Sequence, residues 1–309
     1  MGADCTICLI DKTLHDSVEH LHLYLRKLKV TQEEYYTKYL PRKDLFTGEL
    51  IKFKSLDYYL SADFNSKHNM REWVFANPDK AKVWAFEFLE KRIKAKNLEY
   101  SPTQVELSSL CGPTMHYYNR IGDYYNICQS FGLIPRFVND KLVFSPLHNC
   151  VGIIQDTREK NPLHLSNRYV TTAKLDVGDY GLEDKYNKNV YIERKNINDF
   201  AQTLTKNLSR FERELKRAVK SNSYIVMLVE TSLETALNFD ALPEMRYTKV
   251  TPSHVFKNLR DLLKDYQNFQ VLFVDNREIA AKAVIKIFEL GYQVKSIDLQ
   301  YKFERKELI

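Results

Sequence analysis

The sequence predicts a mixed α/β protein in which a mostly α-helical N-terminal half precedes a domain with a central mixed or parallel sheet. The chain has 309 residues, enough for about two domains of roughly 100–200 residues each. After residue 150, short apolar runs alternate with long amphipathic segments, a pattern typical of a largely parallel sheet with helices on its faces. In the preceding half, apolar residues recur mainly at helical spacing.

The predicted C-terminal domain spans residues 151–309. Strands are expected at 151–155, 190–192, 224–229 and 271–274. Helices are expected at about 198–220, 253–266 and 277–290, the second of which Thr251 and Pro252 introduce as preferred residues at a helix start. Residues 138–150 are predicted to form a linker.

The first predicted element, residues 1–55, contains a helical stretch at 14–28. A second helix is expected to begin at Thr31, because Glu34 three positions later completes a capping box.

Residues 56–137 are predicted to form a helical DNA-targeting module. The periodicity indicates a helix over 80–94, and residues 96–137 are expected to form three short helices. Ser101 is the expected N-cap of the first, with Pro102 at its first position. A helical spacer without DNA contacts is the alternative interpretation.

Composition excludes several classes of protein. With 44% hydrophobic and 28% charged residues, the chain is typical of globular proteins rather than of disordered ones. It has only nine glycines, about 3% where roughly 7% is average, and no pair has the spacing of a phosphate-binding loop, a dinucleotide fingerprint or a nucleophile elbow. The net charge of +6 permits a nucleic-acid partner without requiring one.

Localisation signals are also missing from the sequence. No apolar run approaches the ~20 residues that span a bilayer, so no membrane partner is expected. The first eight residues include an acid and two cysteines and lack the pattern of a signal peptide. Five cysteines are too few for a disulfide framework, which favours a reducing, cytoplasmic location.

Acidic residues and one lysine converge on the ends of the predicted strands. Asp156 directly follows an apolar run, and Asp179 follows a glycine at the edge of a short strand or turn. Glu193 and Lys195 are two residues apart on a strand and therefore share a face. Carboxylates that bind Mg²⁺ or Mn²⁺, beside a lysine that orients water, are the groups that metal-assisted phosphodiester hydrolysis uses.

These residues belong to longer motifs. Asp156-Thr-Arg-Glu159, Gly178-Asp179 and Glu193-Arg-Lys195 with Asp199 resemble the XPF-type nuclease domain, whose signature is a D-x-R-E element followed by G-D…E-R-K-x-x-x-D. The resemblance covers about 150–309. It implies a restriction-endonuclease-like (PD-(D/E)xK) fold. It also implies that Asp156, Asp179 and Glu193 hold Mg²⁺ or Mn²⁺ with Lys195 beside it, and it makes a homodimer through this domain an expectation. The residues it places in supporting roles are Arg158, Glu159, Arg194 and Asp199.

A cationic stripe follows the motif. Five basic residues recur at alternating spacings of four and three, on the side of the predicted helix opposite its apolar stripe: Lys206, Arg210, Arg213, Arg217 and Lys220. Such a row is suited to DNA phosphates, although a solvated cationic face is the alternative. In the helical half, Lys96 and Arg120 are further candidate phosphate contacts.

The N-terminus contains candidate zinc ligands. Cys5 and Cys8 have zinc-knuckle spacing, and His20 follows Cys8 at close to the distance of a two-Cys, two-His finger. His15 has an acceptable spacing to His20 but a short loop from Cys8, and the fourth ligand is open. The alternative is a pair of incidental buried thiols. This stretch and the 96–137 unit resemble the zinc-knuckle and helical-repeat targeting modules of phage and mobile-element homing-type endonucleases.

Together these features predict a divalent-metal-dependent DNA endonuclease that is site-directed, of phage or mobile-element type, and located in the host cytoplasm. A structure-selective nuclease for flaps or junctions and a non-catalytic DNA-binding protein on a nuclease scaffold are the alternatives.

Overall fold

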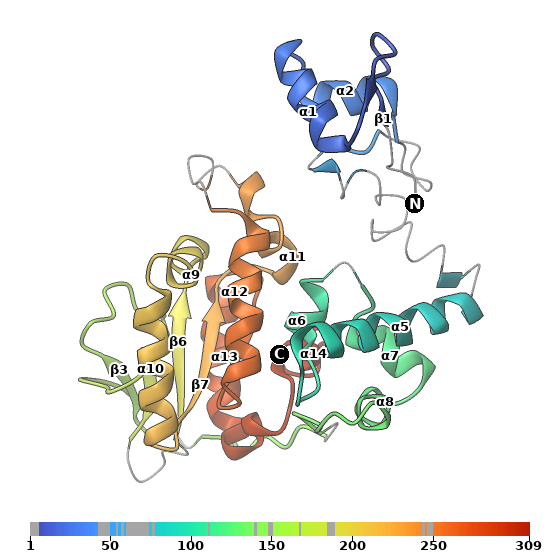
Figure 1. Ribbon diagram of the computed structural model, residues 1–309. Helices are drawn as coiled ribbons and strands as arrows, with labels where there is room; N and C mark the ends of the chain where they lie inside the picture. Colours follow the sequence, from blue (N-terminus) through green and yellow to red (C-terminus); the bar gives the residue numbers. More distant parts are fainter. Residues whose placement is uncertain are drawn as a thin grey trace. The chain divides into compact units, whose positions relative to one another are not determined.

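The structure is a computed structural model of the chain. It describes residues 6–42, 50–53, 55–56, 59, 74–75, 78–110, 112–138, 141–147, 151–166, 168–183, 189–242, 245 and 250–309. These residues form two compact units, 1–87 and 88–309, and each is described by itself (Figure 1). In the described part of the chain, no helix combines the length and apolar character that crossing a bilayer requires.

The first unit contains a small hairpin and two helices. Strands β1 (Thr6–Ile7) and β2 (Leu14–His15) pair antiparallel, and helices α1 (Val18–Lys27) and α2 (Gln32–Tyr39) follow. The predicted helix over 14–28 was wrong at its start, because residues 14 and 15 pair with β1. Ser17 then caps α1 by accepting the N–H of His20. The capping box predicted for α2 is confirmed.

The second unit contains a six-stranded mixed sheet in the order β4-β3-β5-β6-β7-β8. Its strands are β3 (Ile153–Asp156), β4 (Val170–Ala173), β5 (Tyr180–Leu182), β6 (Val190–Lys195), β7 (Tyr224–Val229) and β8 (Phe269–Phe273). Strand β5 runs antiparallel to both neighbours, whereas β6, β7 and β8 are parallel. The predicted mixed sheet is therefore confirmed. Asp156 is the last residue of β3 rather than the first residue after it.

Helices cover both faces of this sheet (Figure 1). Side chains of β7 alternate between two apolar clusters, since Met227 packs on one face and Leu228 on the other. The first face carries α9 (Ile197–Thr203), α10 (Leu208–Lys220), α11 (Leu233–Ala236) and α12 (Pro252–Asp265), with a short turn of helix at Phe239–Ala241. The second face carries α13 (Arg277–Leu290), the 3-10 helix Gly291–Lys295 and α14 (Leu299–Glu304).

The single helix predicted over 198–220 is two helices. The chain breaks after Thr203, and the backbone N–H of Asn207 turns back to the carbonyl of Gln202 (3.0 Å). The side chain of Asn258 on α12 donates to the carbonyl of Leu204 (2.8 Å), which α9 leaves without a helical partner. The break therefore depends on a contact from a distant helix, and the sequence of the segment alone does not reveal it.

The helical segment before the sheet consists of α5 (Pro78–Lys96), α6 (Gln104–Ser108), α7 (Met115–Ile121) and α8 (Tyr124–Ser130). The three short helices predicted within 96–137 are confirmed, but the predicted cap of the first is wrong. Thr103, not Ser101, forms the N-cap, in a capping box with Glu106. The hydroxyl of Ser101 instead accepts the N–H of Arg136 (2.9 Å).

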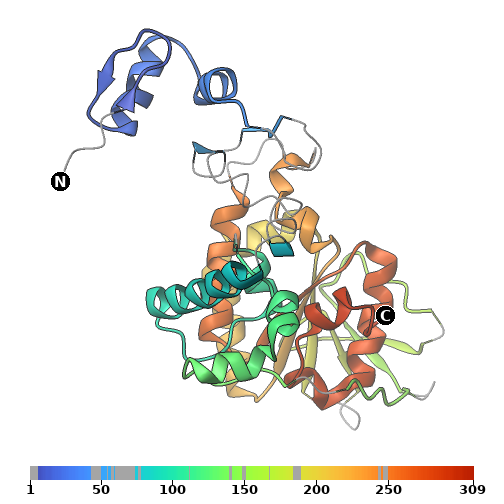
Figure 2. The ribbon, with the colours of Figure 1, turned by 90° about the vertical axis from the view of Figure 1, so that its right-hand side faces the viewer.

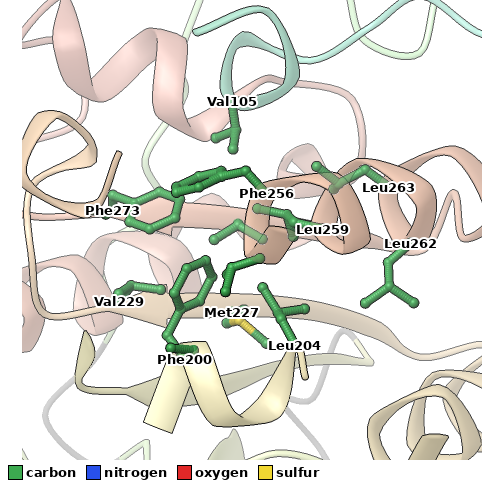
Figure 3. Close-up of a cluster of buried hydrophobic side chains, with 14 of the residues drawn as sticks. Val105, Phe200, Leu204, Met227, Val229, Phe256, Leu259, Leu262, Leu263 and Phe273 are labelled. Carbon is green, nitrogen blue, oxygen red and sulfur yellow. The ribbon is translucent and has the colours of Figure 1, made fainter. Parts of the chain in front are cut away.

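Helix α6 packs directly on the sheet's helices. Val105 of α6 reaches the same apolar cluster as Phe256 of α12 (Figure 3). Gln104 accepts the N–H of Met115, and its own N–H donates to the carboxylate of Asp298 just before α14 (2.7 Å). Figure 2 shows the short helices beside the C-terminal helix.

The described part of the predicted linker also belongs to this unit. Side chains at 142, 144 and 147 pack against the second apolar cluster, and the N–H of Ser145 donates to the carbonyl of Glu289 (2.9 Å). The division between compact units falls at 87/88, so it does not coincide with residues 138–150.

Arg136 joins the helical segment to the sheet. Its guanidinium donates to the backbone carbonyls of Leu263, Tyr266 and Phe269, where α12 ends and β8 begins. Removing it leaves these half-buried carbonyls without their charged donor.

We therefore expect Arg136→Ala to lower the free energy of unfolding by about 2–4 kcal/mol in urea denaturation. Arg213→Ala, an exposed arginine on α10, is the control and should change it by less than about 0.5 kcal/mol. Equal effects of the two substitutions would show that the Arg136 contacts do not stabilise the unit.

Candidate active site

The antiparallel pairing of β5 with β6 brings three predicted site residues together. The N–H of Asp179 donates to the carbonyl of Ile192 (2.8 Å), and the Asp179 carboxylate accepts the N–H of Arg194 (2.8 Å). Asp179 therefore lies against the end of β6 that carries Glu193 and Lys195. The Lys195 ammonium donates to the Glu193 carboxylate, which confirms that the two side chains share a face.

A polar cavity of about 190 Å³ opens beside this group. Its lining combines strand residues with residues of α9 and of the first half of α10, so the break between the two helices forms one wall. The lining residues are Glu193, Lys195, Asp199, Gln202, Thr203, Asn207, Arg210, Phe211 and Glu214.

Burial makes the site electrostatically unusual. Loss of solvent, with the nearby charge of Asp179, raises the pKa of Glu193 to about 8, although Lys195 opposes this. Burial also raises the pKa of Asp179 to about 6, against the opposing effects of Lys195 and the N–H of Arg194. Burial alone would lower the pKa of Lys195, but the carboxylates of Glu193 and Asp179 raise it above its ordinary value. Two carboxyl groups therefore share one lysine here, and a bound cation would stabilise their ionised forms.

Asp156 has a different environment. One carboxylate oxygen accepts the N–H and Nε–H of Arg158 (2.8 and 2.6 Å), and the other accepts the N–H of Leu175 (2.6 Å). Burial raises its pKa, but these hydrogen bonds outweigh burial and hold the pKa below its ordinary value. In this structure the contacts of Asp156 are those of a carboxylate that holds Arg158, so its assignment as a metal ligand stays a prediction.

Two further predicted residues form a buried ion-pair network behind the site. The guanidinium of Arg194 bridges Glu159 (3.3 Å) and Glu230 (3.1 Å), and Arg277 from the first turn of α13 reaches the same Glu230 (3.3 Å). Arg194 therefore fixes the end of β6 and lies away from the cavity lining. Asp199 is exposed and accepts from the side chain of Asn196, the N-cap of α9 (2.7 Å).

The cationic stripe lies on the outside of the unit. Lys206 and four residues of α10 are exposed, and none forms an ion pair with a described residue: Arg210, Arg213, Arg217 and Lys220. Arg210 also lines the cavity, which places the stripe next to Glu193. In the helical segment, Lys96 pairs with Asp261 of α12 (3.4 Å), and Arg120 is exposed in the last turn of α7.

Glu214 is the site residue that sequence reasoning missed. It lies on α10 between the apolar and the cationic stripes and accepts the N–H of Gly178 (3.1 Å). The sequence feature that could have identified Glu214 is an acidic residue at this border, with Arg210 one turn before it and Arg217 one turn after it.

The candidate zinc ligands do not converge in the described residues. Cys5 lies outside them, and Cys8 is buried with Leu21 and Tyr35. His20 is 3.8 Å from the carboxylate of Asp16, and His15 contacts Thr13. The zinc site stays a prediction.

The donors at the cavity fit a divalent ion of the magnesium type. Within the described residues, no three His, Cys, Asp or Glu side chains are placed to hold an ion alone. Mg²⁺ commonly uses one or two carboxylates, completing its shell with water and substrate phosphates. Asp179 and Glu193 supply two such carboxylates beside each other.

Residues 155–286 match the ERCC4 domain family. This match supports the predicted resemblance to the XPF-type nuclease domain for that part of the chain.

Solved structures similar to this chain include XPF from Aeropyrum pernix, which is 21% identical over 46% of this chain and 68% of its own, with a TM-score of 0.35. The same protein in complex with DNA is 19% identical over 45% of this chain and 63% of its own, with a TM-score of 0.34. No match was found among curated proteins.

The raised pKa values predict how stability depends on pH. The folded protein keeps a proton on Glu193 up to about pH 8, whereas the unfolded chain loses it near its ordinary pKa of about 4. Stability of the metal-free protein should therefore fall as pH rises between these values, by at most about 1.4 kcal/mol per pH unit for each proton.

Urea denaturation in EDTA between pH 6 and 8 tests this. That window lies above the pKa of buried Asp298, which burial also raises to about 6. Glu193→Gln should flatten the slope relative to the parent protein, and added Mg²⁺ should flatten it in the parent. An unchanged slope in Glu193→Gln would contradict the assigned burial of this charge.

Proposed function

We propose that this chain is a divalent-metal-dependent DNA endonuclease that hydrolyses phosphodiester bonds, with Mg²⁺ or Mn²⁺ as the ion. The observation that carries the proposal is the group Asp179, Glu193 and Lys195 within the segment that matches the ERCC4 domain. Glu193 and Lys195 of this group line the polar cavity.

Each residue of this group has a distinct task. Asp179 and Glu193 would hold the ion. Lys195, which is mostly buried and paired with Glu193, positions the attacking water and stabilises charge that develops on the phosphate. A bound divalent ion supplies Lewis acidity and lowers the pKa of water. Arg158 is 58% exposed, close to Asp179, and held by Asp156, so it can contact a phosphate next to the cleaved one.

The helix α10 is the proposed contact surface for the DNA backbone. Its exposed arginines have no described acidic partner, and Arg210 connects the row to the cavity. Phosphate contacts of this kind position the duplex without reading its sequence.

Target selection is proposed to come from the helical segment, in a site-directed enzyme of phage or mobile-element type. Cleavage of branched DNA is the second candidate, which the ERCC4 match favours. Duplexes of one sequence, prepared plain, with a flap and with a four-way junction, separate the two. Structural zinc, homodimerisation through the nuclease domain and a cytoplasmic location remain predictions.

Asp179→Asn and Lys195→Ala should each reduce Mg²⁺-dependent cleavage at least about 100-fold, because the first removes a proposed ligand charge of the ion and the second the group proposed to position water. The dissociation constant for DNA, measured in Ca²⁺, should stay within about threefold. Asp265→Asn, an exposed acid at the end of α12, should cleave at the parent rate. Undiminished cleavage by both site variants would overturn the assignment.

Replacing Arg210, Arg213 and Arg217 together by alanine should weaken DNA binding and reduce its salt dependence. Each lost phosphate contact lowers the slope of log affinity against log salt by about 0.9. We expect a decrease of about 2–3, measured by fluorescence anisotropy between 50 and 200 mM salt. Lys282→Ala on α13, across the sheet, is the matched control and should leave the slope unchanged.

A further inference from the structure

We propose that Glu214 is a positioning residue of the nuclease site. Its carboxylate holds the Gly178–Asp179 turn against α10, so that the helix proposed to bind the DNA backbone also fixes the carboxylate proposed to hold the ion. This inference rests on the proposed function and assigns it a residue outside the D-x-R-E, G-D and E-R-K motifs.

The contact joins two distant parts of the chain. Oε1 of Glu214 accepts the N–H of Gly178 at 3.1 Å, over a separation of 36 residues. The side chain is half-buried and lines the cavity with Glu193 and Lys195. A hydrogen bond to a charged acceptor is about twice as strong as one between neutral groups, and partial burial protects it from competing water.

The turn that Glu214 holds has a demanding backbone. Gly178 has φ of +73°, in the left-handed region, and a Cβ added there would lie 3.0 Å from the carbonyl oxygen of Ile192. A glycine satisfies both restrictions but adds no side chain that could stabilise the conformation. The Glu214 carboxylate, which accepts the N–H of Gly178, therefore holds a conformation that the glycine cannot stabilise by itself.

Asp179 follows this glycine directly. Its own N–H and carbonyl are fixed by strands β6 and β3, through Ile192 (2.8 Å) and Asp156 (2.8 Å). The Glu214 contact fixes the residue before it. With the backbone held on both sides, the Asp179 carboxylate has a defined place beside Glu193.

The position of Glu214 on α10 gives the contact a second consequence. Arg210 precedes it by one helical turn and Arg217 follows it by one turn, so all three side chains lie on neighbouring rows of the helix. A helix whose arginines hold phosphates thereby carries the acceptor that positions the catalytic turn.

Two conservative substitutions distinguish the contribution of the length of the Glu214 side chain from that of its charge. Glu214→Gln keeps the side-chain length and a carbonyl acceptor but removes the charge, whereas Glu214→Asp keeps the charge and is one methylene too short. If Glu214 acts by positioning, the Glu214→Gln variant should cleave DNA at a rate within about threefold of the parent rate in single-turnover assays with Mg²⁺. The Glu214→Asp and Glu214→Ala variants should cleave about 10–100-fold more slowly, since a displacement of the Asp179 carboxylate by about 1 Å can lower the rate by that much. Affinity for DNA should be unchanged in all three variants. Glu212→Gln on the same helix is the matched control.

The hydrogen bond can also be observed without activity. The chain contains nine glycines, and only Gly152 and Gly178 follow a valine. Labelling valine carbonyls with ¹³C and glycine with ¹⁵N therefore selects two amides by NMR, and Val151→Ile removes the signal of Gly152. The Gly178 amide should be protected from hydrogen exchange in the parent and in Glu214→Gln, and should lose protection in the Asp and Ala variants.

The outcomes are distinct. A slow Gln variant with a fast Asp variant would overturn the proposal in favour of a role for charge, and so would unchanged Gly178 protection in Asp and Ala. If the parent cleaves none of the DNA substrates, the proposed function fails, while the exchange measurement still decides whether Glu214 holds the turn. Should the Ala variant not fold, the comparison of Gln with Asp gives the answer.

Discussion

The candidate site depends on one short antiparallel pairing. Strand β5 has three residues, and its contact with β6 places Asp179 beside Glu193, although 14 positions separate them in the chain. A parallel arrangement would put the ends of the two strands on the same side but would require a long crossover between them. Here only residues 183–189 separate β5 from β6 in the chain, so the acidic residues meet whatever the chain does further on.

Charged side chains accumulate in the interior next to this pairing. Buried carboxylates destabilise a fold unless they are neutral, paired or bound to a cation. The network of Arg194 with Glu159 and Glu230 lies behind the site and fixes the framework. Lys195 compensates only part of the charge in front of it. The framework is therefore electrostatically satisfied, whereas the cavity side keeps a deficit of positive charge that a metal ion and its waters would remove.

Much of this architecture could be predicted from local patterns. The strand 224–229 and the helix 277–290 have the predicted bounds, because their apolar periodicity and caps suffice to define them. Strands β4 and β5 were missed as elements, since Val170–Ala173 is mostly exposed and Tyr180–Leu182 is too short to show alternation. The helix break at 204–207 and the Glu214 contact could not be predicted, because each needs a partner more than 30 residues away. Motif spacing found Asp179, Glu193 and Lys195 as neighbours but gave no sign that the oxygens of Asp156 are already occupied.

The docking of the short helices has a consequence for how this protein could exchange parts with others. Val105 is part of the main apolar cluster, and Asp298 is fully enclosed with the N–H of Gln104 as a hydrogen-bond donor. A fragment that begins at residue 151 would have a cavity in its apolar core in place of Val105. It would also leave the buried Asp298 carboxyl without the Gln104 donor. Recombination that transfers the sheet to a new N-terminal partner would have to repair both defects at once. The short helices α6–α8 and the sheet are thus expected to be inherited as a single folding unit, with residues before 88 as the part more easily replaced.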